Sequence, residues 1–337
     1  MTRRSSNRSS ITTFAKRVVL FLTLTVSSLA LAQAVPSIGA GGAAASKVPY
    51  RGTSVSYGHT LSPYQYTESE RVWTHRIGIT PEWHFNDAIA LRARLYLTQE
   101  LTQSNTTTNL YEVELSDTWL DGSWSGWKEQ HTGIKIAGDL RATFPTSKQS
   151  QFASRLFTLA PGANVSRTFK VLAGLTLIYA ARFTWRFNRF ATRQNQGGRI
   201  SNCSLGNDID ACSATATGST NLQFDVLHGP TVSFNPHERV NVAASLFMQR
   251  GWGPALAATL TQPERAPQTR DFIGFSLSAT WQAFDMVAFT LGAFTFANQL
   301  DSTGRYIFPL FNRNTAASLD ATFDLEAIVS SLTKEKK

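Results

Sequence analysis

The chain has 337 residues, of which 42% are hydrophobic, and a formal net charge of +9. The first 34 positions contain five basic and no acidic residues, so the remainder carries only about +4, and no basic run within it points to a nucleic-acid partner. Beyond residue 34 no stretch is apolar for the ~18 residues that a membrane-spanning helix needs. A helical membrane protein is therefore excluded.

Residues 1–34 have the layout of a cleaved secretory signal. Basic residues precede a short apolar run, 18–31, which is followed by Ala32-Gln33-Ala34, the small-residue pattern of a cleavage site. Val35 is then the first mature residue, and an uncleaved helical anchor is the alternative. The Gly/Ala-rich residues 35–50 are expected to be a flexible lead-in or a small plug.

Most of the remaining chain changes character at every second residue, which is the period of a β-strand. In residues 171–190 the odd positions are mainly apolar, whereas the even positions include Thr176, Arg182 and Arg186. Each such strand has one apolar and one polar face. Twelve strands are predicted in this way, at 52–61, 71–85, 88–98, 110–120, 129–144, 155–169, 171–190, 221–234, 239–249, 270–284, 286–298 and 315–325.

The connections between these segments alternate in length. The shorter ones are 86–87, 121–127, 169–170, 235–238 and 284–285, and each is followed by a long one. Aromatic residues recur at segment ends. Trp73 and Trp83 are ten positions apart, or ~25 Å along the normal of a membrane crossed by a strand tilted by ~40°. Other expected girdle residues are Tyr111, Trp119, Phe85, Phe144, Phe169, Phe234 and Trp281.

In this layout the mature chain resembles bacterial outer-membrane β-barrels as a class. The resemblance implies an all-β fold, an up-and-down antiparallel transmembrane barrel over residues 51–326, with both termini in the periplasm and a charged tail at 327–337. It also implies contact with outer-membrane lipid and lipopolysaccharide and insertion by the barrel assembly machinery. A soluble β-sandwich is the alternative, but it gives no reason for alternating loop lengths.

If the polar faces line a lumen, the sequence predicts which charges meet there. Glu112 and Glu114 are expected to neutralise Arg92 and Arg94 on the adjacent segment. Arg182 and Arg186 have no acidic neighbour on 155–169, so they are expected to favour anions. The predicted lumen-lining residues are Arg92, Arg94, Glu112, Glu114, Lys135, Arg141, Arg182 and Arg186, with Asp139, Asp225, Asp320 and Asp324 on the same faces. Leu91, Leu175 and Phe275 lie on the opposite faces of their strands and are expected to contact lipid.

The expected function is passive diffusion of small hydrophilic solutes, anions among them, through an outer-membrane channel. A structural or surface-interaction barrel with a closed, salt-bridged lumen and an outer-membrane lipid hydrolase are the alternatives. No catalytic residue, metal site or cofactor is predicted, because His59, His75 and His228 fall on the lipid side with no Ser motif beside them. Cys203 and Cys212, in the longest connection, are expected to form a disulfide.

Overall fold

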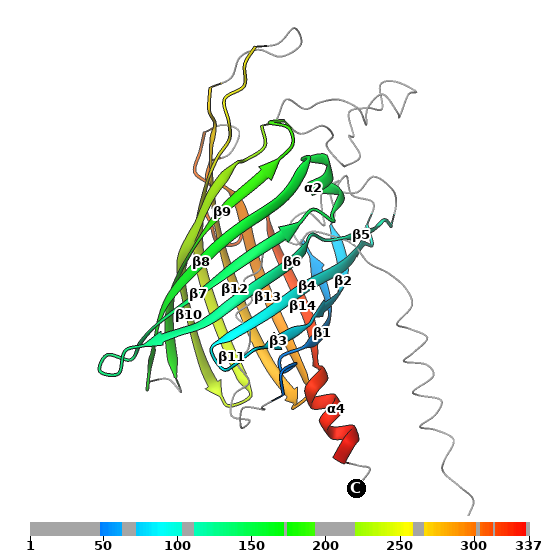
Figure 1. Ribbon diagram of the computed structural model, residues 1–337, viewed down its shortest axis with the longest axis vertical. Helices are drawn as coiled ribbons and strands as arrows, with labels where there is room; N and C mark the ends of the chain where they lie inside the picture. Colours follow the sequence, from blue (N-terminus) through cyan, green and yellow to red (C-terminus); the bar gives the residue numbers. More distant parts are fainter. Residues whose placement is uncertain are drawn as a thin grey trace, which may run out of the picture.

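The computed structural model describes residues 48–62, 72–102, 111–171, 174–192, 220–258, 266–300, 304–312 and 314–334. Its strands form one antiparallel sheet that curls into a barrel (Figure 1). In chain order the strands are β1 (Ser54–Leu61), β2 (Trp73–Thr80), β3 (Glu82–His84), β4 (Ile89–Glu100), β5 (Val113–Leu115), β6 (Thr118–Lys128), β7 (Ile134–Phe144), β8 (Arg155–Phe169), β9 (Leu175–Asn188), β10 (Phe224–His237), β11 (Val240–Trp252), β12 (Thr269–Phe284), β13 (Val287–Asn298) and β14 (Thr315–Asp324).

These strands occupy twelve positions around a closed ring. β2 and β3 pair in succession with β4 and form one position that is interrupted at Pro81. β5 and β6 likewise both pair with β4. The ring closes where β1 pairs with β14 on one side and β2 on the other, so no sheet edge is left open. The predicted twelve-stranded antiparallel barrel is confirmed.

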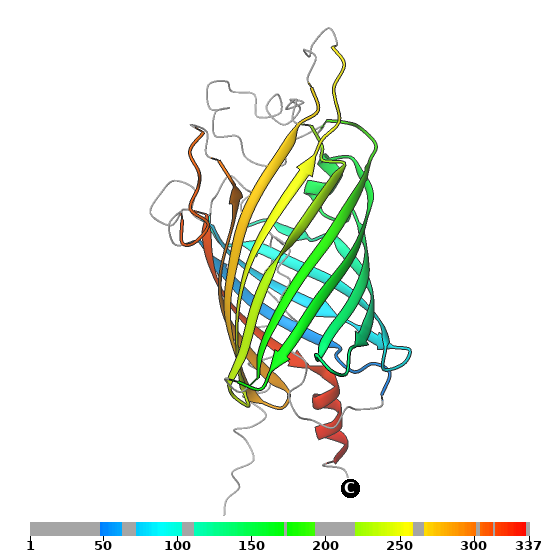
Figure 2. The ribbon, with the colours of Figure 1, turned by 90° about the vertical axis from the view of Figure 1, so that its left-hand side faces the viewer.

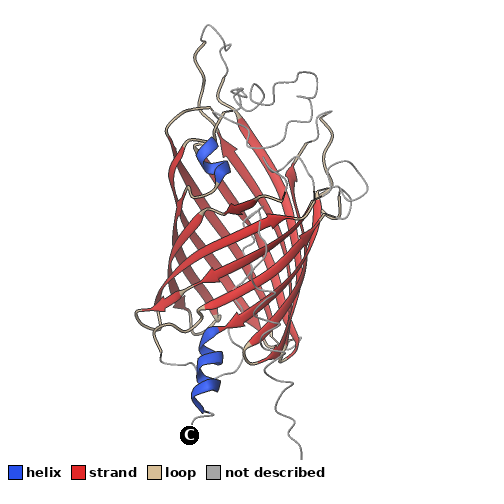
Figure 3. Ribbon diagram, turned by 90° about the vertical axis from the view of Figure 1, so that its right-hand side faces the viewer, coloured by secondary structure: helices blue, strands red, loops and turns tan. Residues whose placement is uncertain are grey.

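The two ends of the barrel differ in the length of their connections. Five short turns, which follow β3, β6, β8, β10 and β12, lie at one end, and the long connections lie at the other (Figure 3). The helix α2 (Lys148–Phe152) belongs to the long β7–β8 connection, whereas α4 (Leu325–Lys334) leaves β14 at the short-turn end. No helix in the described ranges is long and apolar enough to cross a membrane.

The barrel has an apolar outer face and a polar inner face. Figure 2 shows the tilted strands that make up the barrel wall. Trp83 is 50% exposed, Leu140 53% and Leu291 62%, as side chains on the outside of a barrel are. Their neighbours along each strand point inward and are polar or small. Water would disfavour so large an exposed apolar surface, whereas lipid requires it of a barrel's outer face.

One predicted strand boundary is wrong. The expected turn at 121–127 lies inside β6, and the actual turn follows at residues 129–133. Gly126 lies in a bulge, with φ +88° and its missing Cβ only 1.7 Å from the carbonyl oxygen of Ile136. A bulge adds one residue to a strand, so both Trp124 and Trp127 are exposed. Gly122 and Gly126 indicated a turn, but Gly122 lies in the paired strand and Gly126 accommodates the bulge.

Two girdle assignments also change. Trp119 points inward, because its ring lies under the guanidinium of Arg141 at 4.1 Å. Phe144 ends β7 at the long-connection end, not beside a short turn. Phe275 lies on the outer face as predicted, but it is only 5% exposed because Phe311 of the β13–β14 connection packs edge-on against it at 5.1 Å. This residue therefore contacts protein where lipid contact was expected.

The expected tail at 327–337 begins as an ordered helix. Asp324, the last residue of β14, accepts hydrogen bonds from the backbone N–H groups of Glu326 and Ala327 at 2.9 and 3.1 Å. A carboxylate in this position satisfies the first donors of a helix. The strand can therefore turn into α4 without an intervening loop.

Candidate functional site

The inner face of the barrel divides into two regions. The ionic wall is the inner face of β14, β1 to β4 and β6 to β10, where the charged pairs described below lie. The neutral wall comprises the inner faces of β11 over 241–249, β12 over 272–282 and β13 over 288–298. These three described ranges present no charged side chain to the lumen. The distinction follows from which residue types fall on the inward parity of each strand.

The first ion pair of the ionic wall spans three strands. Arg182 of β9 lies opposite Gly162 of β8, which lies opposite Asp139 of β7. Nη2 of Arg182 reaches Oδ2 of Asp139 at 2.5 Å. A Cβ at residue 162 would be 2.6 Å from Oδ1 of Asp139 and 3.2 Å from Nε of Arg182. The missing side chain of Gly162 is therefore what lets the two residues meet along the wall.

A second pair has the same arrangement at the closure of the barrel. Arg76 of β2 and Asp320 of β14 both lie opposite Gly58 of β1. Nη2 of Arg76 donates to Oδ1 of Asp320 at 2.9 Å, and a Cβ at residue 58 would be 1.9 Å from that same oxygen. We call these two arrangements the Arg–Gly–Asp rows. In both, the ion pair spans a glycine on the strand between its two partners.

Arg186 also has an acidic partner. It donates to Oδ2 of Asp225 on β10, while Nε2 of Gln249 on β11 donates to Oδ1 at 2.8 Å. The Asp225 side chain is only 2% exposed. Both oxygens of this buried carboxylate are thus occupied by donors, as a buried charge requires.

Asp121 of β6 is shared by two arginines. Nε of Arg141 donates to its Oδ1 at 2.6 Å, and Nε of Arg94 lies 3.9 Å from its Oδ2. The ring of Trp119 lies against both guanidinium groups, at 4.1 Å from Arg141 and 5.7 Å from Arg94. A cation over an aromatic face is stabilised electrostatically. This site therefore holds two cations with one carboxylate and one aromatic ring.

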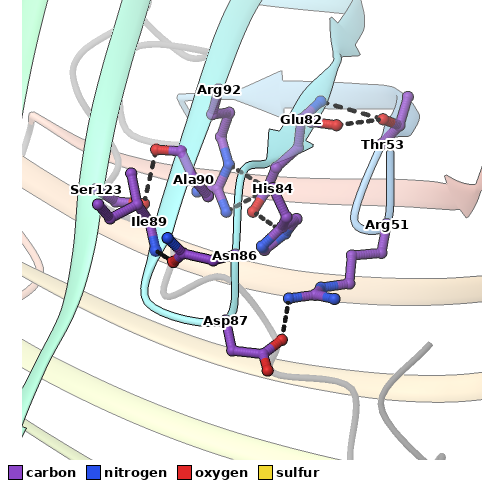
Figure 4. A network of polar contacts seen from close by, with 10 residues as sticks. All are labelled: Arg51, Thr53, Glu82, His84, Asn86, Asp87, Ile89, Ala90, Arg92 and Ser123. Atoms are coloured by element: carbon purple, nitrogen blue, oxygen red, sulfur yellow. Dashed lines mark hydrogen bonds and ion pairs between the residues drawn. The ribbon is translucent and has the colours of Figure 1, made fainter. Parts of the chain in front are cut away.

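At the short-turn end a further cluster centres on Glu82 (Figure 4). Its Oε2 accepts from Nε of Arg92 at 2.6 Å, and its Oε1 lies 3.0 Å from Nε2 of His84. Thr53 bonds to the backbone of Glu82 at 3.1 Å, and Arg51 pairs with the exposed Asp87 at 2.8 Å. These contacts hold the start of the described chain against the barrel rim.

The remaining predicted site residues lie near the two ends of the barrel. Glu112 pairs with Lys148 of α2, and Glu114 of β5 is buried. Arg155, at the start of β8, lies 3.5 Å from Asp117. Lys135 is exposed near the short-turn end of β7. The structure thus places Glu82 beside Arg92 and Asp121 beside Arg94, in the roles predicted for Glu112 and Glu114.

Two electrostatic expectations are therefore wrong. Glu82 accepts a hydrogen bond from Arg92 and Asp121 forms the ion pair with Arg94, in place of Glu112 and Glu114. Arg182 and Arg186 are not uncompensated, since Asp139 and Asp225 bind them. The first error follows from the misplaced turn at 121–127, which removed Asp121 from the wall. The second error has two sources: Asp139 reaches Arg182 from two strands away across Gly162, and Asp225 lies on β10, the neighbour of β9 opposite β8.

Hydroxyl groups pair across the neutral wall and its borders. Oγ1 of Thr280 lies 2.9 Å from Oγ1 of Thr290, and Oγ1 of Thr231 on β10 lies 2.8 Å from Oγ of Ser245. Towards the long-connection end the same wall carries Phe247, Phe272 and Phe296. The period-two pattern contained this aromatic group, but only the strand register shows that the three rings meet.

The outer-face histidines have partners that do not form a hydrolytic triad. Nδ1 of His75 lies 3.0 Å from the Tyr57 hydroxyl, and its Nε2 lies 3.4 Å from Oε1 of Gln99. His59 accepts from Nε1 of Trp73 at 3.3 Å, and His228 contacts the Tyr179 hydroxyl at 2.8 Å. The partners of these three described histidines are tyrosine, tryptophan and glutamine side chains, and none of these contacts involves a serine or cysteine nucleophile.

Two further predictions lie outside the described residues. They are the signal at 1–34 with most of the lead-in, and the Cys203–Cys212 disulfide. Within the described part of the chain, no group of three or more His, Cys, Asp or Glu residues could hold a metal ion. The candidate functional site is thus the lumen wall itself.

No model of a protein family matches the chain, and no protein of curated function matches it. Several solved structures share its architecture. The COG4313 outer membrane channel from Pseudomonas putida F1 is 10% identical, with 84% of this chain and 98% of that chain covered and a TM-score of 0.48. The KdgM porin in complex with disordered oligogalacturonate is 8% identical, with 81% of this chain and 99% of that chain covered and a TM-score of 0.43.

An enzyme of this architecture is also similar. The outer membrane phospholipase A from Escherichia coli is 9% identical, with 82% of this chain and 93% of that chain covered and a TM-score of 0.33. These likenesses concern the barrel fold alone and assign no activity. What the closed ring and its two faces establish is the class: this is a β-barrel of the outer-membrane type.

Proposed function

We propose that the protein is an outer-membrane channel through which small hydrophilic solutes diffuse passively. The apolar outer face supports a membrane location and the polar inner face supports an aqueous path. By analogy with other such barrels, the short-turn end and both termini lie in the periplasm and the long connections lie outside the cell. Contacts with lipopolysaccharide and with the barrel assembly machinery follow from that placement.

The observation that carries this proposal is the direction of the long inner side chains. In both Arg–Gly–Asp rows the arginine binds a carboxylate two strands away, and the ion pair spans a glycine. Such side chains run along the wall, from one strand to the next but one. Eight-stranded barrels are just filled by side chains, whereas much larger ones enclose channels. Twelve strands with side chains held to the wall favour an open path.

The pattern of ion pairs bears on which solutes pass. Paired arginines offer little net field, so the preference for anions that Arg182 and Arg186 would impose is not expected from them. The site around Asp121 is not neutral in this way, because one carboxylate faces two arginines, Arg94 and Arg141. We therefore propose only a weak preference for anions, with its origin at Arg94 and Arg141.

A planar-bilayer recording of the refolded full-length protein tests the channel. We expect discrete, lasting conductance steps in simple salt. The matched pair Ser278→Cys and Ala279→Cys, made with Cys203 and Cys212 replaced by Ser, locates the current. Ser278 is inward and Ala279 exposed on the outside. A bulky water-soluble thiol reagent should reduce the conductance of the first variant and leave the second unchanged.

A closed structural barrel is the second candidate, and the ion pairs favour it in one respect. Cross-strand pairs can stabilise a lumen without any solute passing. If correctly folded protein gives no conductance steps in salt, the channel is excluded and the closed barrel stands. Hydrolysis of phospholipid in detergent by the same preparation would contradict both, and the expectation that the protein is not an enzyme stays a prediction until then.

A further inference from the structure

An aromatic strip interrupts the neutral wall towards the long-connection end. It consists of Phe247 of β11, Phe272 of β12 and Phe296 of β13. The ring centroids of Phe272 and Phe296 are 5.0 Å apart with planes 10° from parallel, and those of Phe247 and Phe296 are 6.0 Å apart at 23°. All three residues are only partly buried. The strip is therefore a continuous apolar patch on the polar side of the barrel.

Gly274 brings the rings of the aromatic strip together. Phe247 and Phe296 both lie opposite Gly274, one on each side. A Cβ at residue 274 would be 2.3 Å from Cε2 of Phe247 and 2.5 Å from the carbonyl oxygen of Thr295. The Phe247 ring thus occupies the space that a side chain at 274 would fill. The strip follows the wall, as the Arg–Gly–Asp rows do.

The surroundings of the strip are polar, and the groups described here bond to other parts of the protein. Gln249, two residues from Phe247 on the same face, donates to Asp225, which also binds Arg186. Arg270, two residues from Phe272, donates to the carbonyl oxygen of Thr220 at 3.2 Å. Along the wall towards the short-turn end the inward residues include Ser245, Ser276 and Ser278. A solute at the strip meets aromatic carbon, amides and hydroxyls.

We propose that the aromatic strip is a binding subsite for the rings of neutral carbohydrates; this deepens the channel function and rests on it. A pyranose ring has a C–H-bearing apolar face and an edge of hydroxyl groups that both donate and accept. The aromatic strip can pack against the apolar face of the sugar, and the flanking hydroxyl and amide groups can hydrogen-bond to its edge. A wholly apolar solute would leave those polar groups unpaired. An aromatic acid would need a cation that is not already paired.

Single-channel recording with maltotriose tests the subsite. We expect the sugar to interrupt the current through the native protein, with a dissociation constant obtained from the concentration dependence. Phe272→Leu and Phe296→Leu keep the apolar character and remove the ring, so each should weaken binding by about three- to tenfold. The control is Phe289→Leu, on the same strand as Phe296 but outward and 39% exposed, which should bind like the native protein.

The outcomes separate the subsite from the channel. An open channel that maltotriose does not interrupt, or whose interruption is unchanged in Phe272→Leu and Phe296→Leu, overturns the subsite and leaves the channel intact. Interruption by benzoate but not by maltotriose overturns it in favour of an aromatic acid. An absence of conductance from correctly folded protein removes both. Circular dichroism spectra of the refolded variants that match the native spectrum show that a weaker sugar effect is not a folding defect.

Discussion

The ionic wall and the neutral wall belong to one sheet but hold their side chains in place by different means. On the ionic wall, partners such as Arg182 and Asp139 are fixed by charge-assisted hydrogen bonds across a glycine. On the neutral wall, Phe247 and Phe296 meet over Gly274 by ring contact alone. The comparison teaches that the missing side chain of a glycine sets the direction of its neighbours whatever their chemistry. Chemistry then decides how much each arrangement stabilises the barrel.

The largest effect is expected where a buried charge loses its partner. Asp225→Asn leaves Arg186 without a carboxylate in a position that is almost fully buried, and breaking such a pair costs about 3–5 kcal/mol. Urea unfolding of the protein in lipid vesicles measures the change. The control is Asp271→Asn, whose partner Arg250 is 60% exposed; an exposed pair is worth at most about 1 kcal/mol. Equal losses in the two variants would contradict the role given to burial.

The glycine under the aromatic strip gives the next largest effect. Gly274→Ala places a methyl group against the Phe247 ring and the Thr295 carbonyl, and overpacking of this kind costs about 1–3 kcal/mol. Because the ring must move off the wall, salt conductance should also fall. Gly122→Ala is the control, since the nearest atom to its Cβ would be 3.9 Å away. Unaltered conductance in Gly274→Ala would show that the Phe247 ring does not depend on the space beside Gly274.

Ion selectivity distinguishes the shared carboxylate from the matched pairs. Arg94→Gln leaves Asp121 with Arg141 alone, so the reversal potential across a salt gradient should shift towards cation preference. A tenfold change in permeability ratio is not expected, because the native preference is weak. Lys135→Gln, which removes an exposed lumen charge near the barrel end, should shift it less. A larger shift for Lys135→Gln would place the selective site at the short-turn end of the barrel.

The smallest effect concerns a charge outside both walls, in the turn after β6. Hydrogen bonds from the Thr132 hydroxyl and from the backbone of His131 and Thr132 lower the pKa of the exposed Glu129 below its usual value. A lowered folded-state pKa stabilises the turn above the usual pKa of Glu, and this contribution is lost as pH falls through the lowered value. Amide exchange of His131 and Thr132 should therefore accelerate in acid. Glu129→Gln should remove that pH dependence while the barrel stays folded.

Much of the architecture was predictable because strand periodicity is local. Alternation in residues 171–190 placed Thr176 and Arg182 on one face, and the structure retains that parity over β9. The prediction failed where local chemistry had two interpretations, as at Gly126, where a bulge and a turn need the same residue. That error removed Asp121 from the predicted wall. The helix α4 is not predicted, because residues 325–326 fit the end of the last strand and residues 327–337 a charged tail.

The pairing of side chains was much less predictable than the strands. Which carboxylate meets Arg182 depends on the register of β7 against β8 and of β8 against β9, and no pattern within one segment contains that information. The same holds for Phe247 and Phe296, which are 49 positions apart in the chain. A glycine on the inward parity is a usable signal, because it marks where residues on the two flanking strands can meet.

The position of the second Arg–Gly–Asp row has a consequence for how the barrel assembles. Arg76 and Asp320 are separated by 244 residues and meet only across β1, the strand that joins the first and last parts of the sheet. Bringing so distant a pair together carries an entropic cost that adjacent hairpins do not have. Their contact therefore belongs to the final step of folding, and a label at either residue would report the moment at which an open, curled sheet becomes a cylinder.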